Sequence, residues 1–175
     1  MSSTATTHSI KSASNTSDVI IRKALPQDAH GIGYVHYHAW LETYTGLIDS
    51  EYLKTLSVQR STKIFESTEC RNVFVAVEDG KIIGFCGYCK ARDEDLPDDC
   101  GEIHGIYILK AHQKGGAGRK LLDSALSELK LNGFKNAVLW VLDTNKNAID
   151  FYEHSGFVFD GAEKEEILVT PIKEK

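Results

Sequence analysis

The stretch Gln113-Lys114-Gly115-Gly116-Ala117-Gly118-Arg119-Lys120 separates a segment with strand character from one with helix character. Residues 102–109, before it, are rich in isoleucine, as a strand is. After it, apolar residues recur along one helix face, at Leu121, Leu122, Ala125, Leu126 and Leu129. A helix amino terminus exposes unpaired N–H groups, and glycine lets a phosphate approach them closely. The stretch therefore predicts an anion site for a phosphorylated cofactor.

Three classes of cofactor compete for such a turn. A nucleotide-binding loop requires Gly-x-x-x-x-Gly-Lys and then Ser or Thr, but Leu121 follows Lys120. A dinucleotide-binding fold requires a third glycine where Leu121 stands, and a βαβ unit where this chain has a hairpin pattern. The third class is coenzyme A.

Outward from this turn, the pattern of residues predicts strands that alternate with a few helices. Asp79-Gly80 is a strong hairpin signal, because glycine permits positive φ. The expected strands are residues 19–23, 72–78, 81–91, 102–109, 137–142, 157–159 and 166–172. The expected helices run from Leu25-Pro26-Gln27-Asp28 to Gly46, over 50–65, from the glycine turn to Asn132-Gly133, and over 147–155.

The composition is that of one ordinary globular domain. The chain has 175 residues, of which 42% are apolar. We expect a disordered Ser/Thr-rich tail at 1–17 and one domain at 18–175. The net charge of -5 argues against general nucleic-acid binding. No apolar run approaches the roughly 18 residues of a membrane span, and the start lacks a secretory signal, so we expect a cytoplasmic protein.

The four cysteines do not predict a disulfide scaffold or a metal site. Cys86 and Cys89 form a Cys-x-x-Cys pair, but they fall in a strand-like segment. Residues three apart on a strand point to opposite faces, whereas a zinc site needs its ligands together. We therefore expect no metal.

Two motifs carry a family resemblance. Gln113-x-x-Gly116-x-Gly118 resembles the Gln/Arg-x-x-Gly-x-Gly/Ala motif of the GNAT (Gcn5-related) N-acetyltransferases, which grips the CoA pyrophosphate. Asn145-x-x-Ala148-x-x-Phe151-Tyr152-x-x-x-Gly156-Phe157 is similar to the second signature of that family. The resemblance implies an α+β fold with a mixed, mostly antiparallel sheet of six to seven strands, flanked by helices and splayed between the fourth and fifth strands.

The resemblance also implies an acetyl-CoA-dependent N-acyltransferase, which moves an acetyl group to a primary amine by direct attack in a ternary complex. Tyr152 takes the family position of the proton donor to the leaving thiolate. Asn145 resembles a residue that contacts the pantetheine arm, and it also suits a helix cap. The remaining cofactor-binding residues implied are Ile106, Tyr107, Ile108, Gln113, Lys114, Gly115, Gly116, Ala117, Gly118 and Arg119. No metal is implied.

Glu102 is the candidate base, since it lies eleven residues before Gln113, the spacing found in part of the family. Strand alternation predicts that Glu102, His104, Ile106 and Ile108 share one face, so that His104 assists or contacts the substrate. Many family members use a water chain instead. Candidates for the acceptor wall are His36, Trp40, Tyr44 and Tyr52.

The acceptor remains open on sequence grounds. Five acids in residues 93–99 favour a cationic amine, such as a polyamine or aminoglycoside, and peptide amines are alternatives. A homodimer is compatible with the family. The alternative function is a CoA-binding sensor or interaction protein without turnover, although binding alone needs no proton donor at Tyr152.

Overall fold

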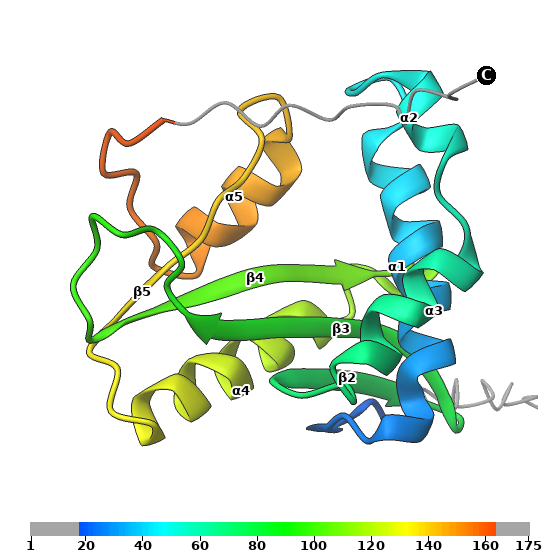
Figure 1. The fold of residues 1–175 in the computed structure, drawn as a ribbon, viewed down its shortest axis with the longest axis horizontal. Helices are drawn as coiled ribbons and strands as arrows, with labels where there is room; N and C mark the ends of the chain where they lie inside the picture. The colour runs from blue at the N-terminus through cyan, green and yellow to red at the C-terminus, as the bar shows by residue number, and fades with distance from the viewer. Residues whose placement is uncertain (1–17, 164–175) are drawn as a thin grey trace, which may run out of the picture.

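The computed structural model describes residues 18–163, which form a sheet with helices on both faces (Figure 1). The expected tail at 1–17 and the expected strand at 166–172 lie outside the described residues. The strands are β1 (Ile20–Lys23), β2 (Val73–Glu78), β3 (Lys81–Lys90), β4 (Cys100–Ile108) and β5 (Asn136–Val138). The α-helices are α1 (Ala29–Tyr44), α2 (Ser50–Lys54), α3 (Val58–Ser67), α4 (Ala117–Leu131) and α5 (Lys146–His154). Short 3-10 helices are η1 (Pro26–Asp28) and η2 (Lys110–His112).

The described strands lie in the order β1-β2-β3-β4-β5, so the sheet follows the chain. Neighbours are antiparallel except β4 and β5, which are parallel. The β2–β3 hairpin turns at Asp79 and Gly80, with φ of 49° and 75°, as the Asp-Gly signal predicts. The expected mixed, mostly antiparallel α+β fold is confirmed.

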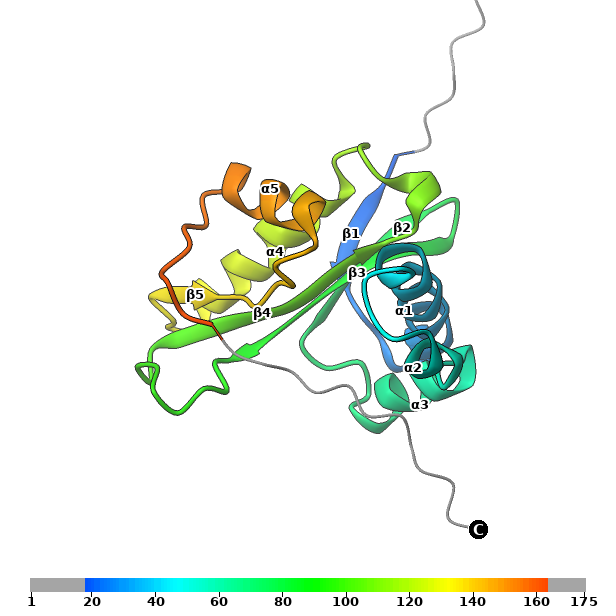
Figure 2. The ribbon, with the colours of Figure 1, turned by 90° about the horizontal axis from the view of Figure 1, so that it is seen from above.

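Two hydrophobic clusters hold the layers together. Figure 2 shows α4 and α5 on one side of the sheet and α1, α2 and α3 on the other. Leu121 and Leu122 of α4 are fully buried and pack against Ile103. Ile32 and Val35 of α1 are fully buried on the opposite face, where they pack with Val75 and Phe85. The apolar stripe expected after the glycine turn therefore forms the core contact of α4.

Three expected elements need correction. The single helix over 50–65 is two helices, because Ser57 accepts a hydrogen bond from the Arg60 amide at 3.1 Å and caps a new start. The strand expected over 137–142 ends at Val138. Residues 157–159 form no strand, since no described segment pairs with them, and the described sheet has five strands.

A β-bulge in β4 reverses the alternation expected there. Gly87 pairs with Gly105 and Tyr88 pairs with Ile103, so His104 is an extra residue. Ile103 packs on the α4 side, and so do Ile106 and Ile108, whereas Tyr107 packs on the α1 side. The prediction that Glu102 and His104 share a face with Ile106 and Ile108 is therefore wrong: Glu102 alternates with Ile103 and faces α1.

The sheet opens between β4 and β5. The two strands pair only at Cys100–Asn136, Gly101–Ala137 and Glu102–Val138. Beyond Glu102, the edge of β4 that faces β5 has no strand partner among the described residues. Figure 1 shows the chain after β5 turning away from β4 toward α5. This is the splay that the family resemblance implies. No helix in the described part of the chain is long and apolar enough to cross a membrane.

Candidate active site

The glycine turn presents free amide groups at the start of α4. Lys114 and Gly116 have φ of 65° and 82°, and Gly116 caps α4 without a side-chain hydrogen bond. The first backbone bond of the helix runs from the Lys120 amide to the Gly116 carbonyl, at 3.1 Å. Within residues 18–163, no acceptor takes the amides of residues 114–119. The turn therefore has the geometry of an anion site.

The side chains of this turn divide into two groups. Gln113 donates its amide to the Ile108 carbonyl at 3.0 Å, which ties the turn to the end of β4. Arg119 pairs with Asp123 at 2.8 Å, one helical turn away. Lys114 and Lys120 are exposed beside the free amides. A positive helix end and two lysines thus surround the place where an anion would lie.

Tyr152 meets β4 where the sheet has opened. Its hydroxyl oxygen lies against the Ile106 backbone N–H, which lowers its pKa, but burial outweighs this contact and the pKa is raised overall. The ring packs on Phe151 and Phe157 at 5.3 and 5.9 Å between centroids. Asn145 caps α5 by accepting from the Ala148 amide at 3.3 Å. The cap at Asn145 is confirmed, and its contact with a cofactor stays a prediction.

Glu102 is one of the few buried acids of the described chain, and it is fully paired. Its side chain is 2% exposed. Arg92 donates to it from Nε at 3.1 Å, from Nη2 at 2.5 Å and from its amide at 3.2 Å. Burial favours a higher pKa, but these bonds outweigh it and the pKa of Glu102 is lowered. The carboxylate is therefore ionised near neutral pH.

His104 acts electrostatically on two other titratable groups. Its charge lowers the pKa of Glu102 and that of His36 on α1. Burial, and then the charge of His104, lower the pKa of His36 to about 4, so His36 is neutral at pH 7. His36 Nδ1 lies 2.9 Å from the hydroxyl of buried Ser61. The β4 bulge thus brings Glu102 and His104 to the α1 side of the sheet.

An aromatic cluster covers this side of the opening. Trp40 lies 4.5 Å from Tyr44 and 6.2 Å from Tyr52 between ring centroids, and His36 lies 5.5 Å from Tyr107. Tyr44 acts electrostatically on both Tyr107 and Tyr152, and together with burial it raises the pKa of each. His36 also lies 5.7 Å from Trp40, so all four predicted wall residues form one group, and Tyr44 links it to the proposed proton donor.

The acidic loop between β3 and β4 is tethered. Asp93 accepts from the Trp140 indole at 2.8 Å, Asp98 pairs with Lys90 at 2.6 Å, and Asp99 pairs with Lys135 at 2.9 Å. The sequence does not predict roles for Arg92 and Trp140, because a pairing across a loop leaves no periodic signal. It predicts none for Glu42 and Glu78 either.

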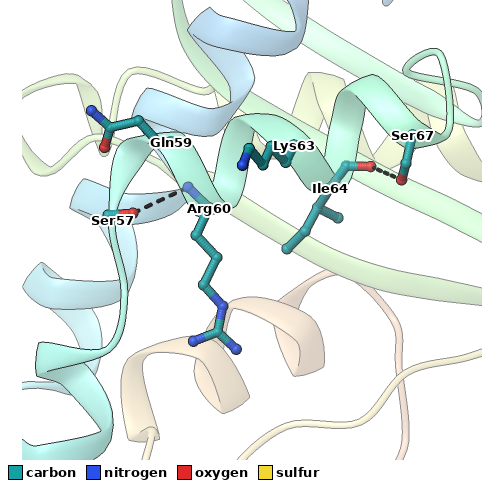
Figure 3. A pocket seen from close by; sticks show the side chains of 6 residues that line it. All are labelled: Ser57, Gln59, Arg60, Lys63, Ile64 and Ser67. Atoms are coloured by element: carbon teal, nitrogen blue, oxygen red, sulfur yellow. Dashed lines mark hydrogen bonds between the residues drawn. The ribbon is translucent and has the colours of Figure 1, made fainter.

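An open hollow runs along the outer side of α3, away from the predicted residues. Figure 3 shows the side chains that line it: Ser57, Gln59, Arg60, Lys63, Ile64 and Ser67. None of them belongs to the predicted site.

The comparisons with known proteins agree with this geometry. The family model described as "Acetyltransferase (GNAT) family" matches residues 32–157. The uncharacterized N-acetyltransferase YuaI of Bacillus subtilis is 33% identical over 138 residues, which cover 78% of this chain and 79% of the relative. A probable N-acetyltransferase of Mycobacterium tuberculosis is 27% identical and covers 83% of each chain.

Solved structures give the same fold. PaiA N-acetyltransferase from Thermoplasma acidophilum, in complex with coenzyme A, has a TM-score of 0.72 at 21% identity and covers 83% of this chain and 93% of its own. YncA from Salmonella typhimurium, with its cofactor acetyl-CoA, has a TM-score of 0.63 at 26% identity and covers 80% and 79%. The chain belongs to the GNAT acetyltransferase family. It is an acetyl-CoA-dependent acyltransferase, as its two motifs predict.

Proposed function

We propose that this chain transfers the acetyl group of acetyl-CoA directly to a primary amine, with both substrates bound together. One observation carries the proposal: the Tyr152 hydroxyl lies against the Ile106 amide at the open edge of β4. The Tyr152 hydroxyl and the Ile106 N–H are thus close together at this edge, and the free amides of the glycine turn come after the end of the same strand.

The cofactor fits the residues that line this path. The amides of residues 114–119, with Lys114 and Lys120, suit the pyrophosphate, because a helix terminus and lysines complement its charge. The unpaired edge of β4 from Ile106 to Ile108 offers backbone groups to the pantetheine amides. Bound there, acetyl-CoA supplies a thioester carbonyl whose oxygen becomes negative as the amine attacks. The Ile106 amide is suited to stabilise that charge.

We assign to Tyr152 the donation of a proton to the departing sulfur. Burial raises the pKa of Tyr152, so the phenol keeps its proton throughout the working pH range. A general acid must be protonated and within hydrogen-bonding reach of the atom it serves.

We assign to Glu102 and His104 the removal of a proton from the attacking amine. Glu102 is ionised, but Arg92 occupies both of its oxygens. We therefore propose that Glu102 draws the proton through the exposed His104 or through water rather than touching the amine. The charges of the Glu102–Arg92 pair also contribute to the electrostatic environment of His104.

A cationic small molecule, such as a polyamine, is the proposed acceptor class. Lys90 and Lys135 offset the charges of Asp98 and Asp99, and Trp140 holds Asp93 in place, so the exposed Glu94 and Asp95 are the acids of this loop best suited to attract a cation at long range. The aromatic cluster at Trp40 and Tyr44 suits an alkylammonium chain through cation–π contacts.

The acceptor proposal is tested by comparing spermidine with an uncharged-side-chain peptide amine. In Glu94→Gln/Asp95→Asn, kcat/KM for spermidine should fall about threefold to tenfold at low salt, with the peptide unaffected. Unchanged kinetics on spermidine would remove the cationic-amine proposal. The alternative function, a CoA-binding sensor, predicts binding without thiol release on any amine, and one active amine excludes it.

A further inference from the structure

Two carboxylates from remote parts of the chain hold the segment that leads into the anion site. Glu42, near the end of α1, accepts a hydrogen bond from the Lys110 backbone amide at 2.9 Å. Glu78, the last residue of β2, lies 2.6 Å from His112 Nδ1. Lys110 and His112 are the first and last residues of η2, which joins β4 to the glycine turn.

An acid bound to the segment that leads into an anion site needs an explanation. Carboxylates repel a pyrophosphate, and the repulsion is screened only beyond about 10 Å at ordinary ionic strength. Glu42 is exposed, and its one hydrogen bond among the described residues is to the Lys110 amide. A carboxylate that repels the anion but connects two elements is better explained by its hold on those elements than by attraction of the ligand.

Few backbone hydrogen bonds hold the segment that follows. After Gln113, no amide donates to a described residue until Lys120 in α4. Two residues in between, Lys114 and Gly116, have left-handed backbone conformations. A chain that is free to leave such conformations loses entropy when it binds a ligand, and anchoring its start reduces that loss.

We propose that Glu42 and Glu78 are positioning residues that hold η2 from α1 and β2, and so preorganise the glycine turn for the CoA pyrophosphate. The inference rests on the proposed binding of CoA at this turn. It also links the two substrates, since Glu42 lies between Trp40 and Tyr44 of the proposed acceptor wall at the end of α1.

The test uses three full-length variants. Glu42→Ala removes the acceptor of the Lys110 amide, Glu42→Gln keeps an oxygen there, and Glu66→Ala removes an exposed carboxylate from α3 as the control. Calorimetry gives the Kd for CoA. Steady-state rates compare acetyl-CoA with S-acetylpantetheine, which lacks the pyrophosphate, and the melting temperature reports on the fold.

We expect Glu42→Ala to weaken CoA binding about tenfold, the scale of one charge-assisted hydrogen bond. The rate with S-acetylpantetheine should stay unchanged, Glu42→Gln should recover most of the affinity, and Glu78→Ala should repeat the loss. Equal losses with both acyl donors, or a Glu42→Ala affinity equal to that of Glu66→Ala, would overturn the inference. Absence of CoA binding to the unsubstituted protein would instead contradict the proposed function.

Discussion

The hydroxyl of Tyr152 lies against the backbone N–H of Ile106, on the part of β4 that β5 leaves uncovered. The two groups come from different elements, α5 and β4, and the sheet has to open for them to meet. Removing the hydroxyl while keeping the ring separates the chemistry of this contact from its packing against Phe151 and Phe157.

Tyr152→Phe should lower kcat about 100-fold, the lower end of what a general acid contributes. The Kd for CoA, measured by calorimetry, should stay within twofold or so, because the free amides of the glycine turn are untouched. Tyr34→Phe is the control, since Tyr34 is 45% exposed on α1. A Tyr152→Phe enzyme with full kcat would show that the thiolate leaves without this proton.

Gly116 and Gly133 form a matched pair at the two ends of α4. Their φ values are 82° and 90°, and a Cβ at either position would meet no atom within 4 Å. Alanine at each should therefore cost a similar backbone strain of about 1 kcal/mol, measured by chemical denaturation. Only Gly116→Ala should also weaken CoA binding, about tenfold or more. Equal CoA affinity in the two variants would argue against an anion site at the turn.

Glu102→Gln should lower kcat about 100-fold if the carboxylate sets the proton path. Arg92→Gln should lower it less, because the carboxylate remains, but it should reduce the melting temperature by leaving a buried acid unpaired. Both are read from pH–rate profiles and thermal melts. Loss of activity in His104→Asn with full activity in Glu102→Gln would move the base to His104 alone.

His36 predicts a pH dependence of stability. Burial and the charge of His104 lower its pKa to about 4, against about 6.5 unfolded. Between these values the unfolded chain binds more protons, so stability is full above about pH 6.5 and falls as the pH drops toward 4. The groups around His36 are Ser61, His104 and the rings of Trp40, Phe65, Phe85 and Tyr107.

Melting temperatures across this range test the point. The free energy of unfolding should fall by about 2 kcal/mol by pH 4.5, and the fall should be smaller in His36→Gln, whose side chain cannot take up a proton. An identical pH profile in the two proteins would mean that other groups cause the acid sensitivity.

Much of the fold was predictable because its signals are local. Asp79-Gly80 fixes the hairpin through backbone freedom, and the stripe at Leu121 and Leu122 fixes the buried face of α4. The bulge at His104 was not predictable, because an extra residue is defined by the register with β3 and not by the residue itself.

The site was predictable only where a motif runs along the chain. The free amides at residues 114–119 follow from the glycine pattern. Arg92 bonds to Glu102, and Glu42 bonds to the amide of Lys110. Each pair joins distant parts of the chain, and no spacing rule predicts such a pair.

Acetyl transfer to an amine frees the thiol of CoA, so thiol release from acetyl-CoA measures the proposed activity most directly. With the purified protein and a panel of polyamines, aminoglycosides and peptide amines, we predict release that depends on one class of amine and falls about 100-fold in Tyr152→Phe. No amine-dependent release from the unsubstituted protein, across the whole panel, would contradict the account.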